Sequence, residues 1–192
     1  MRCFLCSAEI KEASSSYKTW QLCGNCSWMV ERMIGSMAHG KNLKIHWGNR
    51  SLAKNHWMEL KAFLHIHQVT SVLEYGGGLS TELMLLDGYD VTVIESAGWY
   101  GRLCEKIFPK VIIGNDNLPT FKGRFDCAIV DGPQGKGHRW RMVDHALEYT
   151  DRFMYLHDPE MLQVKILVEA GWNPMQQWSM YKEFCRFWQP GT

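Results

Sequence analysis

Short apolar runs and amphipathic segments alternate along the chain from residue 70 onwards. Apolar runs of strand length predict five strands, at residues 72–73, 91–94, 111–113, 125–130 and 153–156. The segments between and after these runs predict helices at residues 81–86, 100–107, 139–150 and 160–170. Pro109 ends the second of these helices and Gly171 ends the last. This alternation of strand and helix predicts a parallel sheet with helices on both faces.

Further elements precede and follow this alternation. Residues 51–67 have apolar positions at a helical period, with Ser51 as a plausible N-cap. Two apolar stretches near the end, 177–181 and 183–188, predict an antiparallel pair of strands. The fold class that follows is α/β, with a doubly wound, mostly parallel sheet of seven strands. Such a sheet binds ligands at the carboxyl ends of its strands.

Charge and composition narrow the classes of partner. The chain has 192 residues, 46% of them hydrophobic, and its 21 basic and 20 acidic residues leave a net charge of +1. This balance does not favour nucleic acid or an anionic membrane surface as a partner. No apolar stretch approaches the roughly 20 residues of a membrane helix, and the first residues do not resemble a signal peptide. We therefore expect a cytoplasmic protein, whose oligomeric state stays open.

The composition also divides the chain into three parts. Residues 1–35 are rich in cysteine and small polar residues, residues 36–50 form a glycine-containing connector, and residues 51–192 form the α/β domain. The first part carries two C-x-x-C pairs, and its four cysteines are Cys3, Cys6, Cys23 and Cys26. Two such pairs at this separation are typical of a four-thiolate Zn²⁺ site. A site with four sulfur ligands has no open position, so we expect this zinc to be structural.

Three consecutive glycines, Gly76, Gly77 and Gly78, lie where the first predicted strand passes into the first helix. A helix N-terminus offers free N–H groups, and glycine lets a ligand approach the backbone, so this loop predicts a nucleotide-like cofactor. Glu95 ends the second strand, where an acid can accept hydrogen bonds from ribose hydroxyls. The dinucleotide pattern G-x-G-x-x-G fails, and Glu74 beside the loop suits a cationic ligand without a pyrophosphate.

At these residues the chain resembles the class I S-adenosylmethionine-dependent methyltransferases. Their first motif is an acid, a spacer and alternate glycines, matched by the stretch EYGGG at residues 74–78, with Ser80 at the last glycine position. The resemblance, which covers about residues 50–190, implies that Gly76 and Gly78 lie under the methionine portion of S-adenosylmethionine and that Glu95 binds its ribose.

The resemblance also assigns two later stretches. It implies that a polar residue after the third strand lies near the adenine, where the sequence has Asn115 and Asp116, and Asp116 is the preferred residue. The stretch FDCAIVDGP matches the fourth motif of the family. In that motif Asp131, at the strand end, faces the methyl group that is transferred.

Two mechanisms for removing the proton of a methyl acceptor fit the residues at the strand ends. In the first, His157 or His138 acts as a general base. In the second, Asp131 and Asp158 hold a divalent cation that binds an oxygen of the acceptor, as in the catechol-type branch of the family. Pro159 stands where that branch has a further acid or amide, so the cation site departs from the family pattern.

Three functions follow from these features. The leading function is methyl transfer to a small, polar acceptor. The basic residues within the stretch 136–141 favour an anionic acceptor. The second is methylation of a nucleic acid gripped by the zinc module, which the near-neutral net charge does not favour. The third is a non-catalytic, zinc-containing adaptor protein.

Overall fold

The computed structural model describes residues 15–17, 20–22, 54–96, 98–114, 117–132, 139–157, 159–175 and 186–191. Near the N-terminus, β1 (Ser15–Tyr17) and β2 (Trp20–Leu22) form an antiparallel pair. This pair lies between the two C-x-x-C motifs in the sequence, while the four cysteines themselves lie outside the described residues.

The rest of the described chain is built on one sheet of seven strands. Its strands are β3 (Ser71–Tyr75), β4 (Asp90–Glu95), β5 (Val111–Ile113), β6 (Phe125–Val130), β7 (Thr150–Leu156), β8 (Trp172–Pro174) and β9 (Phe187–Pro190). Their order in the sheet is β5-β4-β3-β6-β7-β9-β8. The pairs from β5 to β7 are parallel, and β9 is antiparallel to both β7 and β8. The predicted seven-stranded, mostly parallel α/β sheet is confirmed.

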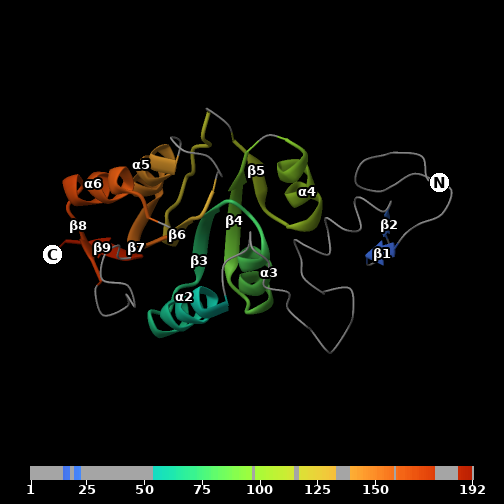
Figure 1. The fold of residues 1–192 in the computed structure, drawn as a ribbon, viewed down its shortest axis with the longest axis horizontal. Helices are drawn as coiled ribbons and strands as arrows, with labels where there is room; N and C mark the ends of the chain where they lie inside the picture. Colours follow the sequence, from blue (N-terminus) through green and yellow to red (C-terminus); the bar gives the residue numbers. More distant parts are fainter. Residues whose placement is uncertain are drawn as a thin grey trace.

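Helices cover both faces of this sheet (Figure 1). The helices are α2 (Lys54–Ile66), α3 (Leu79–Leu86), α4 (Trp99–Ile107), α5 (Arg139–Tyr149) and α6 (Met161–Glu169). Apolar side chains of α2 and α3 pack on one face, and those of α5 and α6 pack on the other. Burial of these two apolar layers supplies the main driving force for folding.

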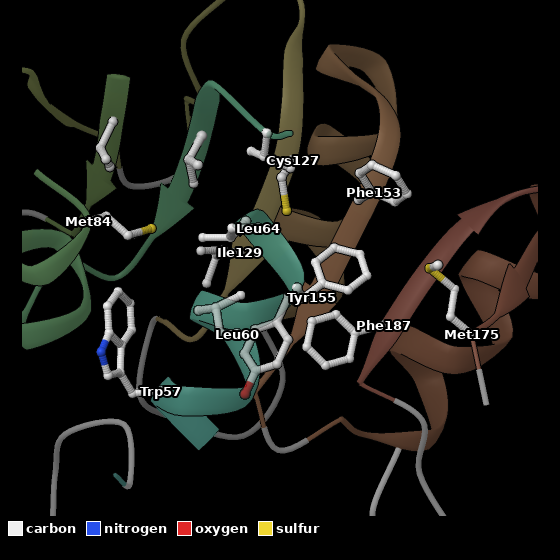
Figure 2. Close-up of a cluster of buried hydrophobic side chains, with 14 of the residues drawn as sticks. Trp57, Leu60, Leu64, Met84, Cys127, Ile129, Phe153, Tyr155, Met175 and Phe187 are labelled. Carbon is white, nitrogen blue, oxygen red and sulfur yellow. The ribbon is translucent and has the colours of Figure 1, made fainter. Parts of the chain in front are cut away.

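The layer beneath α2 is rich in aromatic rings. Phe63 of α2 stacks on Phe187 of β9 with ring centroids 4.3 Å apart, and it meets the edge of Phe153 at 5.1 Å. Figure 2 shows Leu60 and Leu64 of the same helix directed at Ile129 and neighbouring side chains of the sheet. These contacts hold α2 firmly against the central strands, which matters because α2 also borders the candidate site.

Several element boundaries differ from the sequence-based prediction, and two of them are informative. Strand β7 begins at Thr150, which the pattern placed in a helix, because Thr150 pairs with Phe125 across the sheet and is buried. At the C-terminal end, the antiparallel pair consists of Trp172–Pro174 and Phe187–Pro190. The strand expected at 177–181 lies outside the described residues. Non-local pairing decides both boundaries, and it leaves no periodic signal in the sequence.

A carboxylate ties strands together at the amino ends of the sheet. Asp126 Oδ2 accepts hydrogen bonds from the amide and hydroxyl of Thr70, both at 2.7 Å, and from the amide of Ser71 at 3.1 Å. Its Oδ1 accepts a bond from Arg152 at 2.9 Å. Burial opposes ionisation of Asp126, but these bonds outweigh it and lower the pKa of the carboxyl.

We expect Asp126→Asn to lower the free energy of unfolding by about 1–3 kcal/mol at pH 7, because charge-assisted hydrogen bonds are lost. A lowered native pKa gives stability that is present above the unfolded pKa and lost as pH falls, so the difference should shrink below about pH 4. Urea unfolding of the variant and the wild type, at pH 7 and below about pH 4, measures this difference in the free energy of unfolding. Asp90→Asn is the control, because Asp90 pairs with Lys110 at the surface. Equal effects of the two substitutions would contradict this account.

Candidate functional site

The register of the sheet brings several predicted site residues into one line. The side chains of Val93, Glu74, Ile129 and Tyr155 lie side by side on neighbouring strands. Two residues further along the same strands are Glu95, Gly76, Asp131 and His157, here called the carboxyl-end row. Because side chains alternate between the faces of a sheet, this row lies on the face that α2 covers.

Backbone hydrogen bonds hold the carboxyl-end row in register. The amide of Gly76 donates to Ile94, that of Asp131 to Tyr75, and that of His157 to Val130, each at 3.0 Å. These bonds continue the parallel ladder past the last residues of the strands. The row is therefore positioned by the sheet itself, and it places the glycine loop beside the proposed chemical groups.

Two of the three glycines have packing reasons to be glycine. Gly76 has a φ of +96°, and a Cβ there would lie 2.8 Å from the backbone nitrogen of Gly132. Gly77 is buried, and a Cβ there would lie 2.8 Å from a methyl carbon of Val93. The loop therefore packs tightly against the ends of β4 and β6.

Glu74 stabilises the start of α3 from within the protein. Its side chain is fully buried, and the hydroxyls of Ser80 and Thr81 each donate to it at 2.5 Å. The Thr81 hydroxyl also accepts a bond from the amide of Gly78 at 2.9 Å. Burial, opposed by these hydroxyl bonds, raises the pKa of Glu74 to about 8. Thr81 stands where the G-x-G-x-x-G pattern would have its third glycine, and its hydroxyl fastens the loop to Glu74.

Glu95 is joined to the same loop from the end of β4. It is buried, and its carboxylate accepts hydrogen bonds from the amide of Ser96 at 2.8 Å and from the amide of Gly77. Burial raises its pKa, and the negative charge of Asp131 adds to that effect. The negative charges of Asp131 and Glu95 in turn add to the raised pKa of Glu74. The charge of Asp131 therefore influences the ionisation of both glutamates.

Asp131 and His157 form a hydrogen-bonded pair at the ends of β6 and β7. Asp131 Oδ1 and His157 Nδ1 are 2.6 Å apart, and the two side chains are 28% and 13% exposed. Arg139, at the start of α5, donates to the backbone carbonyl of His157 at 3.3 Å. The structure therefore joins two predicted site residues that are far apart in the sequence.

His56 is a neighbour of this pair that the sequence reasoning missed. It lies in the first turns of α2, and its ring meets the ring of His157 edge to face, with centroids 5.6 Å apart. Trp57 and Leu60 anchor this part of α2 in the core. Nothing in the sequence marks His56. Only the packing of α2 against the sheet brings this side chain next to His157.

Several predicted site residues lie outside the described residues: Asn115, Asp116, His138, Asp158 and the cysteines Cys3, Cys6, Cys23 and Cys26. Within the part of the chain that the structure describes, no three His, Cys, Asp or Glu side chains are grouped as metal ligands. None of the described helices combines the length and apolar character needed to cross a bilayer.

Comparison with solved structures identifies the fold. A candidate O-methyltransferase from Klebsiella pneumoniae superposes with a TM-score of 0.52 at 12% identity, over 76% of this chain and 84% of that one. A methyltransferase-like protein from Silicibacter pomeroyi superposes with a TM-score of 0.50 at 14% identity, over 74% of this chain and 90% of that one. The chain has a methyltransferase fold. Comparison of the sequence with protein-family models and with curated proteins gives no match.

The tight packing of Gly76 against Gly132 leads to a prediction about the glycine loop. Gly76→Ala should destabilise the protein more than Gly88→Ala, although both residues have positive φ, +96° and +90°. A side chain at Gly88 would meet nothing within 4 Å, so its cost is the strained backbone alone, about 1–2 kcal/mol. A side chain at Gly76 adds a collision with Gly132. Urea unfolding compares the two variants, and an equal loss of stability would show that the contact with Gly132 adds nothing.

Proposed function

We propose that this protein is an S-adenosylmethionine-dependent methyltransferase that acts on a small, polar acceptor carrying a removable proton. The observation that carries the proposal is the hydrogen-bonded pair of Asp131 and His157, which lies in one row with Gly76 and Glu95. A general base beside the proposed cofactor loop can take the proton that a hydroxyl or amine loses when it is methylated.

The residues at the strand ends fit S-adenosylmethionine. Gly76, Gly77 and Gly78 would hold its methionine portion, and Glu95 would accept hydrogen bonds from its ribose. The negative charge of Asp131 reaches both Glu74 and Glu95, whose pKa values it helps to raise, and this acidic surrounding suits a sulfonium cation and disfavours a pyrophosphate. When bound, this cofactor supplies an electrophilic methyl group. Asn115 and Asp116 remain our candidates for the adenine side.

His157 is the proposed general base. If Nδ1 carries the ring proton and donates a hydrogen bond to Asp131, Nε2 carries no proton and can accept one from the methyl acceptor. The Asp131 carboxylate then stabilises the imidazolium that forms and keeps the ring in one orientation. Arg139 contributes by holding the backbone of His157, while His138 and Asp158 remain further candidates.

Asp131 also belongs to the alternative in which it holds a divalent cation with Asp158. Its Oδ1 already bonds His157, which favours the base over the cation.

For the N-terminal segment, we propose a structural zinc held by Cys3, Cys6, Cys23 and Cys26. An acceptor in nucleic acid is the second candidate function, and the net charge of +1 gives it no electrostatic support.

Titration calorimetry with S-adenosylhomocysteine tests the cofactor and the base together. We expect wild-type protein to bind it, and Asp131→Asn to bind within a few-fold, because S-adenosylhomocysteine lacks the methyl group and the positive charge that Asp131 would face, and the other proposed cofactor contacts lie elsewhere. Turnover with tritiated S-adenosylmethionine and a panel of phenols, amines and sugar acids should fall by about 10²–10⁴ in Asp131→Asn and in His157→Gln.

The control for this experiment is His65→Gln, an exposed histidine of α2 that should leave turnover unchanged. Loss of turnover on treatment with a chelator, and its recovery with added Mg²⁺, would favour the cation mechanism instead. Unchanged turnover in Asp131→Asn would remove Asp131 from the mechanism. A wild-type protein that does not bind S-adenosylhomocysteine at millimolar concentration would contradict the proposed function itself.

For the N-terminal segment, elemental analysis of protein purified without chelator should find about one zinc per chain, because four thiolates form one tetrahedral site. Cys3→Ser should lower the zinc content, since a thiolate ligand is lost. Cys104→Ser is the matched control, because Cys104 is a free, buried cysteine of α4. Absence of zinc from the wild-type protein would rule out the module.

A further inference from the structure

A histidine outside the proposed catalytic pair joins three separate parts of the fold. The Tyr75 hydroxyl and His145 Nδ1 are 2.6 Å apart, and His145 Nε2 lies 2.7 Å from the backbone carbonyl of Pro119. Tyr75 is the last residue of β3, His145 belongs to α5, and Pro119 lies between β5 and β6. Both ring nitrogens therefore have a partner on a different element.

The partners determine which nitrogen of the neutral ring carries the proton. A carbonyl only accepts hydrogen bonds, so Nε2 must be the protonated nitrogen and must donate to Pro119. Nδ1 is then an acceptor, and the Tyr75 hydroxyl donates to it. Tyr75 is buried, with 1% of its surface exposed, so this hydroxyl has little access to water as an alternative partner.

The segment that His145 holds crosses the sheet without regular structure. Strands β5 and β6 are separated in the sheet by β4 and β3, so the chain between them must pass over both. Its described residues, 114 and 117–124, contain neither helix nor strand. Leu118 and Phe121 attach the segment to the core on the α5 face through partly buried contacts. Because such a segment has no hydrogen-bond ladder of its own, the bond to His145 does much to determine its position.

Both ends of this connection are close in the sequence to residues proposed to bind the cofactor. Tyr75 directly precedes Gly76, and its carbonyl accepts hydrogen bonds from the amides of Asp131 and Gly132 at 3.0 and 2.6 Å. The crossing segment contains Asn115 and Asp116, the proposed adenine-side residues, a few positions before Pro119 in the sequence. A change in His145 would therefore act at once on the residue that precedes the glycine loop and on the segment that carries the proposed adenine-side residues.

We propose that His145 is a positioning residue for the cofactor, one that fixes the crossing segment relative to the glycine loop through its bonds to Tyr75 and Pro119. This inference rests on the proposed function. His145 acts through Tyr75 and Pro119, so it differs in kind from Asp131 and His157. Its effect should appear in cofactor affinity, because the bonds it makes join the strand that leads into the glycine loop to the segment proposed to carry the adenine-side residues.

The test measures S-adenosylhomocysteine affinity by titration calorimetry, at a temperature well below the melting point of every variant. Tyr75→Phe and His145→Phe should each weaken binding about tenfold, the equivalent of one buried hydrogen bond. The double variant should be no weaker than the worse single variant, because both substitutions break the same connection. His145→Gln should recover part of the affinity, since its side-chain amide can both donate and accept a hydrogen bond.

Tyr149→Phe is the matched control. Tyr149 packs against the same histidine, with ring centroids 4.8 Å apart, but its hydroxyl makes no hydrogen bond within the described residues. It should leave the affinity unchanged. If His145→Phe does not fold, Tyr75→Phe and His145→Gln decide the matter.

Two results would overturn the inference, and they differ in meaning. Wild-type binding that Tyr75→Phe and His145→Phe preserve within twofold, with only the melting temperature lowered, would reduce His145 to a structural role. Absence of binding by the wild-type protein would overturn the proposed function and this inference with it.

Discussion

The close contact between Gly76 and Gly132 is the constraint on which the candidate site depends. At these two residues the chain leaves β3 and β6, and a Cβ on Gly76 would lie 2.8 Å from the Gly132 nitrogen. The Tyr75 carbonyl accepts bonds from both Asp131 and Gly132, so the ends of the two strands are joined through one oxygen. Because the strand ends meet without side chains between them, Asp131 is brought next to the glycine loop.

From this contact the electrostatics of the site follow. Glu74, Glu95 and Asp131 lie on one face of adjacent strands, and burial, together with the negative charge of Asp131, raises the pKa values of the two glutamates. Buried carboxyls without a compensating cation are costly, and such costs are typical of functional sites. Hydroxyls of Ser80 and Thr81 offset part of the cost at Glu74, and the ring of His157 bonds Asp131.

The two faces of the sheet contribute to the site in different ways. On one face, α2 packs through its apolar residues and brings His56 beside His157. On the other face, a segment without regular structure crosses β4 and β3, and His145 supplies the partner that its Pro119 carbonyl needs. The proposed catalytic pair thus borders a helix packed on the core, whereas the crossing segment is held by specific bonds such as the one from His145 to Pro119.

The sequence by itself determined the order and type of most elements, since apolar runs and helical periods are local patterns that burial on a sheet face imposes. It also marked Gly76, Glu95, Asp131 and His157, because each follows a buried strand at a position where the carboxyl ends of a parallel sheet converge. Only the tertiary structure decided the pairing of Asp131 with His157, the approach of His56 and the connection through His145. These contacts join residues far apart in the chain, so they depend on sheet order, strand register and helix packing. None of those leaves a repeating pattern in the sequence.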